Sequence, residues 1–146
     1  MAGLPSGYDN LVVPVAVFSD PEIAIAGRIE EKPGIKVTKF PLSALGIAIA
    51  LDKTNGFVKV ASDSQNIVKG IEIVGQSAAT MISEAALAIE MGALLEDLAL
   101  TIHPHPTLGE VVMEAAEATL GHAIHIIQKP LSRTETTNRP TTATRT

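Results

Sequence analysis

Two of the four histidines of the chain lie in one short segment, HPHPTLGE, at residues 103–110. This segment brings imidazoles, prolines and a carboxylate together, which are the ingredients of proton-transfer chemistry. His105 and Glu110 are five residues apart across a Pro-Thr turn. Such a turn can fold the carboxylate back toward the ring, where it would fix the tautomer and stabilise the imidazolium after proton uptake. The segment therefore predicts an acid–base pair.

The same histidines could instead bind a metal ion. His-x-His in an extended segment points both rings the same way, and imidazole suits zinc, copper or nickel. The available donors are His103, His105, Glu110, His122 and His125. The last two lie beyond a whole predicted helix, however, and the chain has no cysteine for a thiolate site. Spacing disfavours a metal-binding module, and we expect no metal site.

A purely structural role for the segment is also open. Thr107 and Glu110 have the spacing of a capping box, in which the hydroxyl caps a helix and the carboxylate returns to the Thr amide. Glu110, Glu114 and Glu117 follow one another at helical spacing, as a solvated face would. One carboxylate cannot easily serve as cap and as histidine partner, so these two interpretations compete.

Composition narrows the class of protein. The 146 residues are 46% hydrophobic but only 3% aromatic, with a net charge of −5. The last 18 residues have four basic side chains against one glutamate, which leaves −8 on residues 1–128. An acidic body without an aromatic platform disfavours nucleic acid as a partner. No apolar run is long enough for a membrane span and no signal peptide is visible, so we expect a cytoplasmic chain without membrane contact.

The chain divides into strands followed by helices. Residues 13–75 favour mostly antiparallel strands, among which we include IAIAL at residues 47–51. Helical spacing follows in SAATMISEAALAIEMG, in LLEDLAL and in TLGEVVMEAAEATLG, with Gly92 and Gly121 as helix stops. This order predicts an α+β fold, a two-layer sandwich of one antiparallel sheet and about three helices. We expect residues 1–12 to be a linker, 13–127 to be the domain, and 128–146 to be a disordered Thr/Arg-rich tail.

The last predicted helix is apolar around almost its whole circumference. One sheet can cover only one side of such a helix, so its other side needs a second partner. We therefore predict a homodimer with this helix in the interface. The interface residues would be Val111, Val112, Met113, Ala115, Ala116 and Leu120.

Several segments together resemble a known family. HPHPTLGE resembles the His-x-His-Pro-Thr-Leu-x-Glu segment of dihydrolipoamide dehydrogenases. YDNLVVPVAVFSDPEIA, KFPLSALG and IVKGIEIVGQSAATMISEAALAIEMG resemble the same family in the same order. The resemblance covers about residues 8–127, and it is to the dimerisation (interface) domain of the pyridine-nucleotide disulfide oxidoreductases, of the lipoamide type.

The resemblance implies roles for individual residues. His105 corresponds to the acid–base of dithiol–disulfide exchange, Glu110 to its orienting carboxylate, and His103 to a less essential histidine. The His105–Pro106 bond would be cis, and the pair of one subunit would complete the active site of its partner. FAD and NAD serve the parent enzymes, but this chain has neither a Cys-x4-Cys disulfide nor a Gly-x-Gly-x-x-Gly loop. We therefore expect no cofactor in this chain and no activity from it alone.

Four apolar residues depart from what the resemblance leads us to expect. They are Ile25, Ile47, Leu94 and Leu95. Exposed apolar groups often mark interfaces. An alternative function is therefore a natural or engineered structural building block, whose apolar surface docks a second protein into a larger symmetric assembly. Ordinary sequence variation would explain the same residues without any partner.

Overall fold

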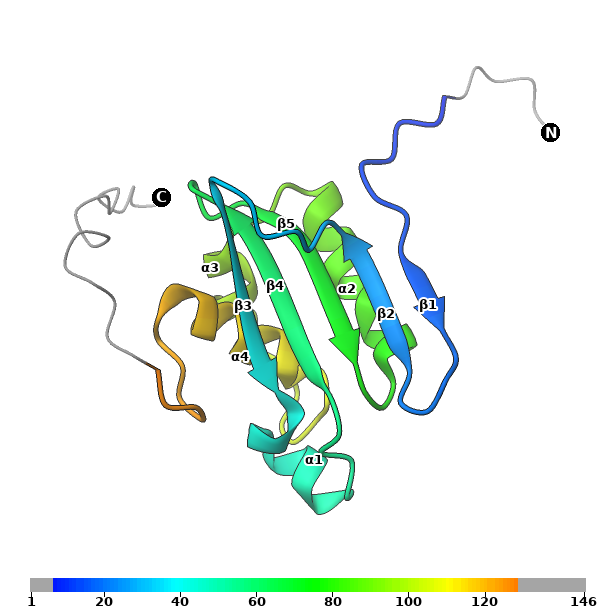
Figure 1. Ribbon diagram of the computed structural model, residues 1–146, viewed down its shortest axis with the longest axis vertical. Coiled ribbons are helices and arrows are strands. Elements are labelled where there is room, and N and C mark those ends of the chain that lie inside the picture. The colour runs from blue at the N-terminus through cyan, green and yellow to red at the C-terminus, as the bar shows by residue number, and fades with distance from the viewer. Residues whose placement is uncertain (1–6, 129–146) are drawn as a thin grey trace.

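The computed structural model describes residues 7–128, which form a sheet with helices on one face (Figure 1). All strand pairs are antiparallel, and the order across the sheet is β1-β2-β5-β4-β3. The strands are β1 (Val15–Val17), β2 (Ile23–Gly27), β3 (Ile35–Pro41), β4 (Phe57–Asp63) and β5 (Val68–Val74). The predicted α+β sandwich is confirmed. Most of the predicted tail and half of the predicted linker lie outside the described residues.

The two long helices divide the sheet between them. Helix α2 (Ala78–Glu90) packs on β2 and β5, and α4 (Glu110–Leu120) packs on β3 and β4. The short α3 (Leu95–Leu100) packs against α4. Gly92 and Gly121 follow α2 and α4 with φ of 62° and 83°, the left-handed conformation that ends helices, as predicted.

The prediction of a strand at residues 47–51 is wrong. A 3-10 turn (Leu42–Ala44) leads into helix α1 (Gly46–Ala50) at this point. The Ile-Ala alternation is typical of a strand, but the buried side chains are Leu42, Leu45 and Ala48. These recur every third residue, which is the spacing of one helical face.

Cross-strand rows of apolar side chains make the core. Ala24, Ile73, Val58 and Phe40 lie opposite one another on four neighbouring strands, and each is 0% exposed. Full burial of a large apolar side chain contributes about 1.5–3 kcal/mol. The small Ala24 on β2 allows α2 to approach closely, which suits the alanines buried on that helix.

Long-range polar contacts hold α2 and α4 on the sheet. Glu22 accepts a hydrogen bond from the amide of Ala79 at 3.0 Å, which caps α2 from a loop far away in the sequence. Glu90, near the other end of α2, accepts the amide of Val12 at 3.0 Å. The Lys36 ammonium of β3 donates to the Thr119 carbonyl near the C-terminus of α4, where the helix dipole favours a cation.

Helix α4 is covered within a single chain, contrary to the premise of the predicted interface. Four of the six predicted interface residues have no exposed surface: Val111, Val112, Ala115 and Ala116. Strands β3 and β4 and helix α3 pack against α4. Residues 121–128 also fold back toward the helix, with Ile126 against the core and the Gln128 amide donating to the Ala118 carbonyl. Of the predicted set, only Met113 and Leu120 keep accessible surface.

Candidate functional site

His105 and Glu110 lie together at the start of α4. His105 Nδ1 is 2.7 Å from Glu110 Oε1, and Glu110 Oε2 accepts the Thr107 amide at 2.8 Å. The carboxylate thus makes both predicted contacts, one with each oxygen. The Thr107 hydroxyl donates to the Pro104 carbonyl instead of capping the helix. Residues 108–109 form a turn, and α4 begins at Glu110.

This geometry leaves one ring nitrogen of His105 available for proton transfer. The His105 side chain is 82% exposed, whereas that of Glu110 is 14% exposed. A carboxylate at Nδ1 holds the tautomer whose proton is on that nitrogen, so Nε2 is a free base directed at solvent. The His105–Pro106 peptide bond is cis, as the resemblance implies. The arrangement can take up and return a proton at Nε2.

Glu110 is set up to stay ionised. Burial acts to raise its pKa, but the hydrogen bonds from His105 and from the Thr107 amide outweigh burial and lower the pKa below its ordinary value. An ionised carboxylate is what an imidazolium at His105 requires. The direction of this shift therefore agrees with an acid–base pair.

The lowered pKa predicts a pH dependence of stability. Above the ordinary value of 4.5 the ionised Glu110 stabilises the fold, and this contribution is lost as the pH falls through the lowered pKa. Glu110→Gln is expected to reduce the unfolding free energy at pH 7 by about 1–2 kcal/mol. Urea unfolding from pH 3 to 7 should show the wild type and the variant converging at the acid end. A difference that stays constant with pH would contradict the assignment.

His103 lies on the same loop but faces inward. Its side chain is 9% exposed, and Nε2 is 3.0 Å from Glu84 Oε1 on α2. Sequence reasoning missed Glu84, because it lies 19 residues away in a helix whose acidic position looks like an ordinary solvated one. No spacing rule connects two residues that meet only through packing.

The donors considered for the alternative metal-binding module are kept apart. Each histidine is next to a different glutamate: His103 to Glu84, His105 to Glu110, His122 to Glu117 and His125 to Glu114. Within residues 7–128 no three His, Asp or Glu side chains converge on a point where a metal could sit. The arrangement gives the metal-binding alternative no support.

Glu114 is buried, which corrects the solvated face predicted for α4. It is 3% exposed, and its Oε1 is 2.6 Å from His125 Nδ1. Its Oε2 has no hydrogen-bond partner among the described residues. The carboxylate therefore depends on His125, which also ties the segment after α4 to the helix.

Removal of this histidine should cost stability. A buried carboxylate that loses its partner keeps its desolvation cost, so His125→Ala is expected to lower the unfolding free energy by about 2–3 kcal/mol. His122→Ala is the matched control, because His122 is 56% exposed and 3.6 Å from Glu117. It should change stability by less than about 0.5 kcal/mol in urea titrations. Equal losses in the two variants would rule out the special role of Glu114.

The four predicted docking residues do not form one surface. Leu95 is fully buried and is corrected to a core residue. Leu94 pairs with Ile67 just before β5 begins, whereas Ile47 lies in α1 after β3 ends, at the opposite end of the sheet. Ile25 lies on the sheet face that carries no helix, opposite Val15 and Glu72. Of the four, only Ile25 belongs to that open face.

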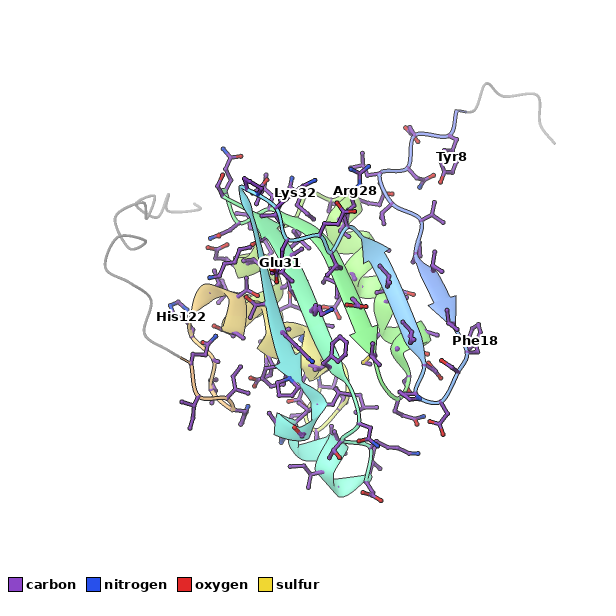
Figure 2. The ribbon with its side chains drawn as sticks, in the orientation of Figure 1. Tyr8, Phe18, Arg28, Glu31, Lys32 and His122 are labelled. Atoms are coloured by element: carbon purple, nitrogen blue, oxygen red, sulfur yellow. The ribbon has the colours of Figure 1, made fainter. Side chains whose placement is uncertain are left out.

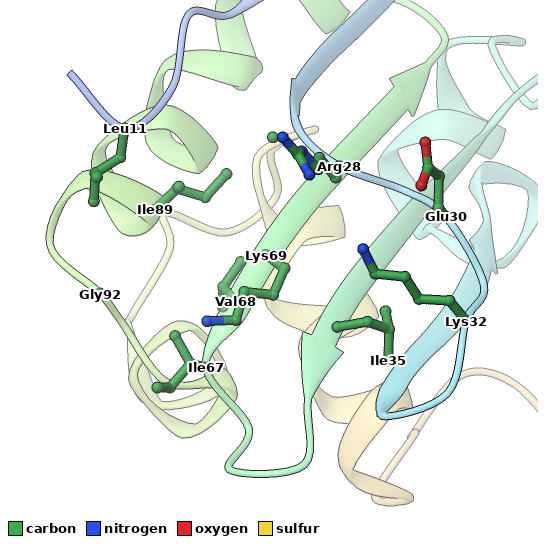
Figure 3. A pocket seen from close by; sticks show the side chains of 11 residues that line it. Leu11, Arg28, Glu30, Lys32, Ile35, Ile67, Val68, Lys69, Ile89 and Gly92 are labelled. Atoms are coloured by element: carbon green, nitrogen blue, oxygen red, sulfur yellow. The ribbon is translucent and has the colours of Figure 1, made fainter.

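The described residues also contain a cleft of about 460 Å³ near the ends of β2 and α2. Figure 3 shows Leu11, Ile67 and Ile89 on one side of it and Glu30 and Lys32 on the other. None of the predicted site residues lines this cleft. The loop that bears His105 therefore lies outside this cleft, at the surface of the domain.

No helix within residues 7–128 has the length and apolar character needed to cross a bilayer.

The sequence of the chain is similar to those of several known proteins. Residues 13–116 match the family described as the pyridine nucleotide-disulphide oxidoreductase dimerisation domain. A dihydrolipoyl dehydrogenase of Geobacillus stearothermophilus is 50% identical over 135 residues, which are 88% of this chain and 29% of the relative. One of Haloferax volcanii is 48% identical over 88% of this chain and 28% of its own length. The chain thus spans less than a third of these relatives.

Solved structures have the same fold. LpdA from Mycobacterium tuberculosis superposes with a TM-score of 0.68 at 27% identity, over 73% of this chain and 24% of that one. The HOCl-induced flavoprotein disulfide reductase RclA from Escherichia coli has a TM-score of 0.65 at 24% identity, over 69% and 25%. The likeness to RclA bears on the fold alone.

Proposed function

Because the chain belongs to the family of pyridine nucleotide-disulphide oxidoreductase dimerisation domains, we propose that it self-associates into a homodimer and presents His105 as an acid–base group for dithiol–disulfide exchange. The observation that carries the chemical part is the 2.7 Å contact between His105 Nδ1 and Glu110 Oε1 beneath an exposed ring. The chain has no cysteine, so the disulfide must come from outside these 146 residues. The chain is inactive alone.

The surface beside the histidines supports self-association. Leu100 and Ile102 lie three residues and one residue before His103 and are 80% and 95% exposed. Leu87 of α2 and Met91, the residue after the helix, are also exposed. They follow Glu84 by three and seven residues and so continue the same helix face. The Glu84–His103 contact brings these two segments together. We call Leu87, Met91, Leu100 and Ile102 the histidine-flanking surface and propose that it contacts a second copy.

The proton steps follow from the free Nε2. A substrate dithiol gives one S–H proton to His105 Nε2, and its thiolate attacks the external disulfide to form a mixed disulfide. The external thiolate released by this attack takes the proton back from His105. Nε2 then accepts the proton of the second substrate thiol, whose sulfur attacks the mixed disulfide, closes the substrate disulfide and displaces the other external thiolate. That thiolate receives the second proton, so the dithiol is oxidised and the external disulfide is reduced to two thiols. Glu110 stabilises the imidazolium formed in the first step, and His105 afterwards returns the proton.

FAD and NAD, the cofactors of the dihydrolipoyl dehydrogenase family, do not fit the described residues. The N-termini of α2 and α4, where phosphates would bind, already hold the carboxylates of Glu22 and Glu110. The turn from β5 into α2 has one glycine, Gly75, and no glycine-rich loop.

A chimera tests the proposal directly. The matched segment of the Geobacillus stearothermophilus relative would be replaced by this chain, leaving the other parts of that enzyme in place. The chimera is expected to oxidise dihydrolipoamide, whereas this chain alone should not. A folded, dimeric chimera without activity would contradict the proposed role.

A second candidate function is docking through the open face of the sheet. Val15 and Val17 of β1 are exposed on that face beside Ile25. Phe18, the residue after β1, projects outward at this edge strand of the sheet (Figure 2). A further domain or protein could cover this surface. Ile25→Ser should then reduce the mass of any assembly larger than a dimer in light scattering. Unchanged mass would remove this candidate, and Ile47→Arg on α1 is the control.

A further inference from the structure

The ring of His103 contacts Glu84 of helix α2 and two loop residues, Thr101 and Gly109. On one side its Nε2 is 3.0 and 3.2 Å from the two carboxylate oxygens of Glu84 on α2. On the other side its Nδ1 is 2.9 Å from the Thr101 carbonyl oxygen. Its Cδ2 edge lies beside Gly109, where an added Cβ would be 3.6 Å away. The ring therefore bridges α2 and the residue that precedes α4.

Both nitrogens of His103 face groups that accept hydrogen bonds. A carbonyl oxygen accepts only, and a carboxylate accepts only. Neutral imidazole has a single N–H and can donate to one of these acceptors, whereas imidazolium donates to both. The carboxylate of Glu84 from α2 contacts the ring through both of its oxygens.

We propose that His103 is a positioning residue, held as an imidazolium between Glu84 and the Thr101 carbonyl, that fixes the loop bearing His105 and Glu110 onto helix α2. The loop needs such an anchor because His105 itself is 82% exposed and, within residues 7–128, makes one hydrogen bond, to Glu110. The charge-assisted contact to Glu84 joins residues 19 apart and sets the position of the loop relative to the body of the domain. This inference rests on the proposed acid–base function for its purpose, but it can be tested separately.

NMR of the histidine rings tests the proposal. In the wild-type chain at pH 7, both ring nitrogens of His103 are expected to carry a proton. Glu84→Gln should leave one nitrogen unprotonated and accelerate hydrogen exchange of the Thr107 amide, which Glu110 accepts, by about tenfold. Glu117→Gln is the matched control, since it removes the partner of the exposed His122 and should change neither signal.

A second variant keeps the test valid if Glu84→Gln unfolds the chain. His103→Gln can still donate to Glu84 but has no charge, and it should also accelerate exchange at Thr107. A singly protonated wild-type ring, or unchanged Thr107 exchange in a folded variant, would overturn the proposal. If the acid–base function is wrong but the role of His103 is right, the results differ. His105→Gln would then leave the chimera active, and the NMR signals of His103 would still be those expected here.

Discussion

His105→Gln in the chimera is expected to lower the rate of dithiol oxidation by about 10²–10⁴-fold. Gln occupies a similar volume but cannot take up a proton, so the thiolate would have to form without a base. Because His105 is 82% exposed and only its partner Glu110 is largely buried, the substitution should not disturb the fold. Steady-state rates with dihydrolipoamide measure the loss.

Two controls make this result specific. His122→Gln changes another exposed histidine of the same chain and is expected to keep full activity. Glu110→Gln should cause a smaller loss than His105→Gln, because the ring remains but its imidazolium is less stabilised. Activity of the His105→Gln chimera within about twofold of the parent chimera would show that the histidine is not the base.

Leu100→Asp together with Ile102→Asp is expected to weaken self-association by at least about 100-fold. Burial of a large apolar side chain contributes about 1.5–3 kcal/mol, so loss of two exceeds the roughly 2.8 kcal/mol that this factor represents. The new carboxylates would also have to be desolvated in the interface. Both residues are highly exposed in the single chain, so the fold should survive. Sedimentation velocity over a range of concentrations gives the dissociation constant.

The matched control lies on α1. Ile49 and Leu51 are 60% and 51% exposed, and their replacement by Asp adds the same charge to an apolar surface outside the histidine-flanking surface. This control should leave the dimer intact. If it dissociates the dimer while the Leu100/Ile102 variant does not, the contact surface has been assigned to the wrong side of the domain.

Local patterns predicted the fold well where periodicity and turn chemistry agreed. The change from strands to helices gave the α+β class, and Gly92 and Gly121 marked the helix ends because few other residues adopt positive φ. The proximity of His105 and Glu110 was also predictable, since a short turn joins them. The family resemblance was confirmed by the match over residues 13–116.

Features that depend on tertiary packing could not be predicted in the same way. The apolar circumference of α4 indicated a second chain, but α3 and strands β3 and β4 of the same chain already pack against the helix, and Ile126 packs against the core. The helical spacing of Glu114 predicts a surface residue, but in the folded chain His125 lies against its carboxylate. Glu84 meets His103 only because α2 packs beside the loop. In each case the partner is far away in the sequence, and no local spacing encodes it.

The native mass of the purified chain tests self-association most directly. Sedimentation equilibrium from low to high micromolar concentration should give twice the chain mass of 15.2 kDa, with dissociation only at the lowest concentrations. A folded particle that stays at 15.2 kDa across the whole range would contradict the proposed self-association, because the chain would then be a monomer.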